Sequence, residues 1–225
     1  MAEGALSRRV YNEILGRLLR GEVKPGQFFN RRQIAAELGV SVAPVLEAML
    51  ELQTEGLIES LPRQGTRVRQ LTVEDVRGQL IVREALECQA ARLYCGPPVE
   101  KDLPRLLPMA REIDAAELRS IEHIREEVRF HHELVSLAAV PALNEAFERV
   151  MKLGLLFAVQ ALHPSHKYAP KSSHVKLVNA LVSSDADAAE AVVRAHVQSG
   201  KEALFERWTG AEARRAHRRP AWLGE

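Results

Sequence analysis

Four side chains in the second half of the sequence are of types that bind a divalent cation. Glu127 and His131 are four residues apart, so within a helix they project from one face and can share an ion. His174 begins one predicted helix and His196 lies in the next, and two antiparallel helices joined by a tight turn can bring both imidazoles to a common centre. One carboxylate with three imidazoles suits zinc, nickel, cobalt, manganese or iron.

Spacing alone leaves a second interpretation open for these residues. The sequence has 8 histidines, and His123 shares the helical face that carries Glu127. Histidines that are partly exposed or hydrogen-bonded to neighbours are the alternative to a metal site.

The elements that must position these side chains are helical. After residue 71 we predict a long helix from Thr72 to Tyr94, which Gly96-Pro97-Pro98 ends. The stretch 99–118 has apolar periodicity, but Pro104 and Pro108 predict an irregular or kinked helix there. Further helices are predicted over 121–138, 141–162, 174–182 and 185–208, followed by a mobile basic tail at 209–225.

The first 70 residues show a different pattern. Apolar positions predict a helix over 6–19, a short helix that Asn30 caps and Gly39 ends, and a third helix that Ser41 caps. Two short extended runs then flank Pro62-Arg63-Gln64-Gly65, which predicts a hairpin. Three helices and a hairpin in this order match a winged helix-turn-helix, whose second helix of the turn enters a major groove, and a small α+β adaptor is the alternative on this pattern alone. The predicted fold is therefore mainly α, a winged helix-turn-helix followed by an all-α bundle of six or seven helices.

Composition excludes several classes of protein. The chain of 225 residues is 46% hydrophobic with a net charge of +1, which suits an ordinary core and not a disordered chain. Its longest uncharged apolar-rich run, 153–162, falls short of the roughly 20 residues that a bilayer needs, and the first residues lack an apolar signal core. We expect a cytoplasmic protein with no membrane partner. Cys88 and Cys95 lie about 10 Å apart along one predicted helix, too far for a disulfide.

The N-terminal region resembles a known family. The string PGQFFNRRQIAAELGVSVAPVLEAMLELQTEGLIESLPRQGTRV, residues 25–68, is similar to the DNA-binding domain of the GntR regulators, and we assign that domain to residues 6–70. The resemblance implies double-stranded operator DNA as a partner and a homodimer that reads two half-sites. It also places Arg32 and Gly65 at DNA-contact positions. The remaining candidate DNA-binding residues are Arg31, Ser41, Arg63, Gln64 and Thr66.

The predicted recognition helix departs from the family pattern. Members usually have Arg-Thr after the serine and an arginine before the Glu-Ala pair, whereas this chain has Val42-Ala43 and Leu46. The loss of two guanidiniums removes donors for phosphate or guanine. Binding is then weaker, dominated by the wing, directed to an unusual operator, or lost altogether. Apolar contact of Val42, Ala43 and Leu46 with thymine methyl groups is one way to read such an operator.

The helical region resembles the FCD effector domain of FadR- and VanR-type GntR proteins over residues 72–208. The run EVRFH (127–131) is similar to the Asp-x-x-Phe-His element of that domain, VREALE (82–87) to its first helix, and 174–197 to its last two helices. The resemblance implies that Glu127, His131, His174 and His196 bind a metal. Glu127 stands where aspartate is usual, and Val140 stands in a loop where Asn-Pro is common.

An open coordination position would admit a ligand. Four protein ligands fill a tetrahedral site but leave two positions free in an octahedral one, and a small carboxylate effector fits there. Arg83 can hold such an anion through two hydrogen bonds, although an ion pair with Glu84 or Glu87 is an equal alternative.

These observations favour a ligand-responsive, DNA-binding transcriptional regulator. The competing class is a metalloenzyme that uses the same Glu127 and histidine centre. An enzyme would need a base or nucleophile beside the metal, and no further acid, serine or cysteine stands in an interpretable relation to it. We therefore expect no enzymatic activity. A third possibility is a regulator homologue with altered or lost DNA binding.

Overall fold

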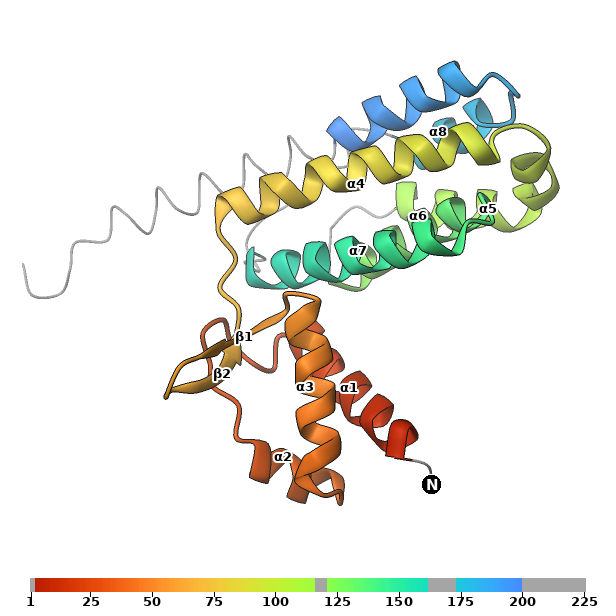
Figure 1. Ribbon diagram of the computed structural model, residues 1–225. Helices are drawn as coiled ribbons and strands as arrows, with labels where there is room; N and C mark the ends of the chain where they lie inside the picture. The colour runs from red at the N-terminus through yellow and green to blue at the C-terminus, as the bar shows by residue number, and fades with distance from the viewer. Residues whose placement is uncertain (1–2, 116–120, 162–172, 200–225) are drawn as a thin grey trace, which may run out of the picture. The chain divides into compact units, whose positions relative to one another are not determined.

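A computed structural model describes residues 3–115, 121–161 and 173–199 (Figure 1). The chain divides into two compact units, which are described separately. Met1–Val76 with Arg149–Gln160 form the first unit, and Arg77–Glu148 with Ala161–Glu225 form the second.

The first unit contains the predicted winged helix-turn-helix. Helices α1 (Glu3–Leu19), α2 (Arg31–Leu38) and α3 (Val42–Thr54) precede strands β1 (Ile58–Leu61) and β2 (Gly65–Val68). The strands are antiparallel, with Ile58 opposite Val68. Ile14 and Leu18 of α1 and Leu52 of α3 are buried in its core, because the apolar positions of both helices recur at helical spacing. The mainly helical fold class and the hairpin are thus confirmed.

Local capping explains the two helix boundaries of the turn. Asn30 accepts a hydrogen bond from the backbone N–H of Gln33, and Gly39 adopts φ 64°, the left-handed conformation that ends many helices. Ser41 occupies the N-cap position of α3, but its side chain makes no capping hydrogen bond. Ser41 therefore lies at the predicted cap position but does not cap α3 through its side chain.

The second half of α7 (Pro141–Ala161) belongs to the first unit. Lys152 donates to Glu55 Oε1 at 2.6 Å and to the Tyr11 hydroxyl at 2.8 Å. Gln160 donates through its amide to the Arg69 carbonyl oxygen. Sequence order does not reveal this grouping, because α7 lies far along the chain from the residues that it contacts.

The second unit is helical in the residues that the structure describes. Its elements are α4 (Val73–Tyr94), of which the second unit takes Arg77 onward, α5 (Pro97–Ala115), α6 (Ile121–Ser136), the start of α7, α8 (His174–Ala180) and a final helical stretch over 186–199. Thr72 and Asp75 cap α4 reciprocally, since each side chain accepts from the backbone N–H of the other. α4 and the stretch 186–199 lie side by side (Figure 1), with Arg92 joining Asp187 at 2.5 Å.

One prediction for this unit needs correction. Residues 99–115 form the body of a continuous α-helix that contains Pro104 and Pro108, so the prediction of an irregular helix is wrong, whereas that of a kinked helix stays a prediction. Tertiary burial outweighs the two missing backbone hydrogen bonds here, because Leu106, Ala110 and Ile113 are almost fully buried. The expected tail at 209–225 lies outside the described residues.

Membrane-spanning potential is low among the described helices. No single one of them is both long and apolar enough to cross a bilayer, and only α2 with α3, bent by 116° from each other, passes that test as a pair on length and composition.

Candidate metal centre and nucleic-acid interface

Three histidines from three helices meet in the second unit. His131 comes from α6, His174 is the first residue of α8, and His196 lies in the stretch 186–199. One ring nitrogen from each lies within 4.8 Å of the other two, and this is the one such group of potential metal ligands among the described residues. The ring centroids of His174 and His196 are 4.7 Å apart.

His131 is oriented by a buried carboxylate of α4. Its Nδ1 lies 2.7 Å from Glu87 Oε2, and both side chains are only 4% exposed. Glu87 also accepts from Arg83 Nε at 2.5 Å. Burial raises the pKa of the Glu87 carboxyl, but Arg83 and His131 outweigh burial and hold that pKa well below its usual range. An ionised Glu87 can accept the Nδ1–H of His131, and the other ring nitrogen, Nε2, then faces away from Glu87.

His174 is oriented in the same manner by Asp114 of α5. The distance from His174 Nδ1 to Asp114 Oδ1 is 2.9 Å, and the same carboxylate accepts the backbone N–H groups of His174 and Val175 and the hydroxyl of Ser173. Burial raises the pKa of Asp114, yet these hydrogen bonds lower it overall. Nε2 of His174 is buried and has no hydrogen-bond partner.

Two of the three imidazoles are held neutral. Burial lowers the pKa of His174 to about 4, and electrostatic repulsion from His131 acts in the same direction. Burial lowers the pKa of His196 to about 3, again helped by His131. A neutral imidazole keeps a lone pair for a metal ion, so the cluster has the donor chemistry that zinc, nickel or iron prefers.

Glu127 lies near the histidine cluster but outside the group of three. Its Oε1 is 3.6 Å from His123 Nε2, and its charge raises the pKa of His174. The structure therefore brings His131, His174 and His196 together as the sequence predicted, while Glu127 is paired one helical turn away.

Arg83 adopts the ion pair with Glu87 that the sequence left as an alternative to anion binding. Its side chain is 23% exposed, and its positive charge contributes to the lowered pKa of His196. Arg83 is thus within electrostatic reach of the cluster.

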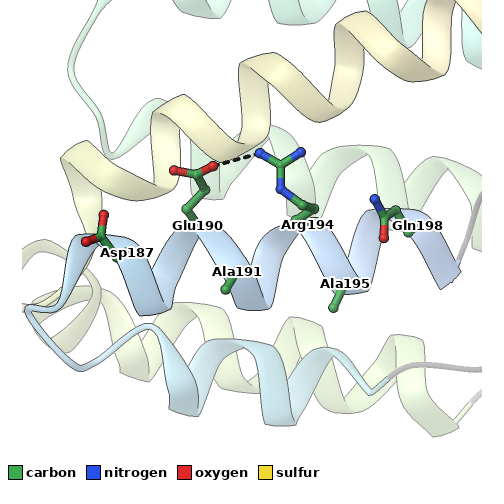
Figure 2. Close-up of a pocket in the computed structure, with 6 residues that line it drawn as sticks. All are labelled: Asp187, Glu190, Ala191, Arg194, Ala195 and Gln198. Atoms are coloured by element: carbon green, nitrogen blue, oxygen red, sulfur yellow. Dashed lines mark hydrogen bonds and ion pairs between the residues drawn. The ribbon is translucent and has the colours of Figure 1, made fainter.

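A surface hollow in the same unit is separate from the histidines. One face of the stretch 186–199 lines it (Figure 2), and its charged side chains are already paired. Arg194 joins Glu190 at 2.7 Å and Glu84 at 2.5 Å, and Asp187 joins Arg92. The lining residues are Asp187, Glu190, Ala191, Arg194, Ala195 and Gln198. None of them offers an unpaired charge to a ligand.

The predicted DNA-binding residues fall in the first unit. Arg32 of α2 and Ser41 before α3 are exposed. Arg31 instead donates from Nη2 to the Thr66 hydroxyl at 2.8 Å, so it ties the start of α2 to the hairpin.

The tip of the hairpin is exposed at Arg63, Gln64 and Gly65. Gly65 has φ 111°, which side chains with a Cβ rarely adopt, and Arg63 has φ 63°. Thr66 differs from the prediction, because it is 2% exposed and its hydroxyl contacts Arg31 and Ser60. The Thr66 hydroxyl thus makes hydrogen bonds inside the first unit and is not exposed for a hydrogen bond to DNA.

Sequence reasoning does not identify two carboxylates of the candidate metal centre, Glu87 and Asp114. The sequence indicates Glu87 only as an ion-pair partner for Arg83. Asp114 lies in the segment that its prolines led us to treat as irregular. Spacing between elements carries no signal for such contacts, which join residues on different helices.

Comparisons with known proteins agree with this architecture. Residues 6–68 match the family model described as bacterial regulatory proteins, gntR family, and residues 80–199 match the FCD domain. The second match alone covers more than half of the chain.

Individual relatives are regulators by name. The uncharacterized HTH-type transcriptional regulator YdhC of Bacillus subtilis (strain 168) is 32% identical over 146 residues, which span 64% of this chain and 65% of that protein. The HTH-type transcriptional repressor RspR of Escherichia coli (strain K12) is 25% identical over 203 residues, 86% of this chain and 88% of that protein.

A solved structure shares the fold. E. coli McbR/YncC superposes with a TM-score of 0.70 at 22% identity, covering 90% of this chain and 98% of that one. With the family matches, these results show that the chain is a DNA-binding transcriptional regulator of the GntR family with a C-terminal FCD domain.

Proposed function

We propose that the FCD domain, residues 72–208, binds one divalent transition metal and that a small carboxylate bound at this metal controls operator binding by residues 6–70. The observation that carries the proposal is the buried Nε2 of His174, which has no partner and lies beside two further imidazoles. A buried polar atom without a partner costs free energy, and a metal ion removes that cost.

The surrounding groups fit a metal ion. His131, His174 and His196 are the proposed ligands, and Glu127 is the proposed fourth, since a glutamate four residues from His131 shares its helical face. Glu87 and Asp114 hold His131 and His174 through Nδ1, as carboxylates commonly do for metal-bound histidines. The ion would supply a positive centre for an anion. Its candidates are zinc, nickel, manganese, cobalt and iron.

Arg83 is the proposed second contact for the effector carboxylate. Its Nε holds Glu87, and the proposal assigns its terminal nitrogens to the anion. A planar guanidinium suits a carboxylate through two parallel hydrogen bonds. The positive charge of Arg83 lowers the pKa of His196. Arg83 and a metal ion bound at His196 would therefore both attract the same anion.

The proposed regulation is a coupling between two binding events. A metal-bound carboxylate would tie together α6, α8 and the stretch 186–199, which supply the histidines, while α4 connects to the wing through residues 70 and 71. A ligand shifts DNA binding only by its different affinity for the two states, and couplings of about 1–3 kcal/mol change affinity about 5–150-fold.

For DNA we propose that the exposed side chains of Arg32, Ser41, Arg63 and Gln64 and the backbone at Gly65 contact the operator, and that the chain acts as a homodimer in the cytoplasm. One recognition helix reads only a few base pairs, so dimers read two half-sites. Ile81, Val82 and Leu93 leave apolar surface exposed on α4, which supports pairing with a second copy.

Calorimetry and DNA binding together test the proposal. Metal-loaded and metal-free protein are each titrated with a panel of small mono- and dicarboxylates, and operator affinity is measured with and without each acid. We expect heat and a changed affinity for at least one acid with the metal-loaded protein only, and loss of that response in Arg83→Ala. Absence of heat and of any change in affinity across the panel would contradict the effector role.

A further inference from the structure

The outward face of α3 is apolar over its first two turns. Val42 is 38% exposed and Leu46 is 43% exposed, and Ala43 between them is exposed as well. We call these three residues the apolar strip. Large exposed apolar side chains that line up on a helix commonly mark a binding surface.

The polar side chains of α3 are already engaged within the first unit. Glu47 accepts from Ser7, and Glu51 accepts from Arg8 at 2.9 Å, so both acids face α1. Gln53 accepts from Ser60, and Thr54 donates to the backbone of its own helix. The helix contains no lysine, arginine or histidine. The polar side chains within α3 are therefore already engaged beside the strip, and the adjacent polar group is the hydroxyl of the N-cap residue Ser41, which makes no capping hydrogen bond.

The surroundings of the strip favour DNA as its occupant. Arg32 at the start of α2 and Arg63 at the tip of the wing are exposed cations that suit phosphates on either side of a groove. In a helix-turn-helix, the N-terminal residues of the second helix contact base edges, and the strip occupies those positions of α3. The major groove offers an apolar side chain one distinctive feature, the C5-methyl group of thymine.

We propose that α3 reads thymine methyl groups through Val42, Ala43 and Leu46, so that each half-site is specified by the position of its thymines and not by guanine contacts. This inference rests on the DNA-binding function that the family establishes, and it is independent of the metal centre. On this proposal, the absence of the two guanidiniums from α3 changes which operator the chain binds and does not abolish DNA binding.

The test compares operators that differ only by methyl groups. The full-length chain selects double-stranded DNA from a random library, and the enriched sequence is then synthesised with uracil in place of thymine at its invariant positions. We expect affinity to fall about fourfold for each contacted methyl group removed, at an unchanged salt slope because the phosphate contacts remain.

Variants of α3 locate the contact. Leu46→Ser should weaken binding to the thymine operator and reduce the difference between thymine and uracil by the share of the methyl group that Leu46 contacts, while Val42 and Ala43 keep theirs. Leu50→Ser makes the same change one turn further along α3, where the side chain is 64% exposed, and it should keep both the affinity and the thymine preference of the parent.

Three results would overturn the inference. Equal affinity for thymine and uracil operators would exclude methyl reading while leaving DNA binding intact. An equal loss in Leu46→Ser and Leu50→Ser would show a general effect of polarity on α3. Selection that enriches no sequence, with Arg32→Ala as weakly bound as the parent, would instead indicate that the strip binds another protein.

Discussion

The two candidate sites of this chain are built in opposite ways. The candidate metal centre is mostly buried, with His131 and His174 buried and His196 half-buried, and it draws its side chains from α4, α5, α6, α8 and the stretch 186–199. The nucleic-acid interface is exposed and draws on residues within a short stretch of the first unit. Burial makes each contact in the first site depend on its neighbours, whereas solvent screens the contacts of the second.

This difference predicts two kinds of response to mutation. A cluster in which Glu87 orients His131 and Asp114 orients His174 should lose its metal when one or two of its histidines are removed. An exposed interface that holds phosphates should weaken in small and similar steps.

The largest effect is expected from removing two imidazoles. The double variant His131→Ala with His174→Ala should purify without bound metal, since two of the proposed ligands are gone. A metal present at about a thousand times its dissociation constant stabilises the folded state by about 4 kcal/mol, and the variant should lose this increment. Metal content by elemental analysis and melting temperature with and without added metal test both points. If the variant contained as much metal as the parent, the result would contradict the metal site and favour histidines that are only hydrogen-bonded to their neighbours.

A weaker but informative effect is expected at Glu87. Glu87→Gln removes the charge that orients His131, and the loss of such an orienting carboxylate typically lowers metal affinity 10–100-fold. The control is His132→Ala, which changes the adjacent histidine, a side chain that is 38% exposed and pairs with Glu148. Calorimetric titration with metal should show the decrease in Glu87→Gln only. Equal affinities in the two variants would contradict the orienting role.

At the exposed interface, Arg32→Ala should reduce operator affinity and leave the melting temperature unchanged. If Arg32 contacts a phosphate, the slope of log affinity against log salt should become shallower by about one unit. Titrations at several salt concentrations measure that slope. An unchanged slope with unchanged affinity would remove Arg32 from the interface.

The smallest effect is expected at Thr66, where the structure replaces a DNA contact with an internal one. Thr66→Val leaves Arg31 and Ser60 without their partner, which should lower the free energy of unfolding by about 1–2 kcal/mol. Chemical denaturation measures this value. A change in the salt slope of DNA binding without a change in stability would restore Thr66 to the interface.

Much of the fold was predictable because its signals are local. Asn30 and Gly39 bound α2 as their residue types predict, and Thr72 with Asp75 caps α4. The continuity of α5 through Pro104 and Pro108 was not predictable, because it depends on burial against other helices and local propensity opposes it.

The candidate sites were likewise predictable only where their signals are local in the sequence. His131, His174 and His196 were predicted as a group from their helical placement and from a family resemblance, and they lie together. Asp114 had no local signal, since its role depends on α5 meeting α8. The pairing of Arg83 with Glu87 was one of two open alternatives, because a spacing of four residues permits an ion pair but does not require it.

Anomalous X-ray scattering from crystals of the purified chain decides whether His131, His174 and His196 form a metal site. The data are collected above and below the absorption edges of zinc, nickel, cobalt, iron and manganese. We expect one anomalous peak per chain among the imidazoles of His131, His174 and His196, at the edge of one of these metals. No anomalous peak at that position, in crystals grown with each metal added in turn, would contradict the metal site.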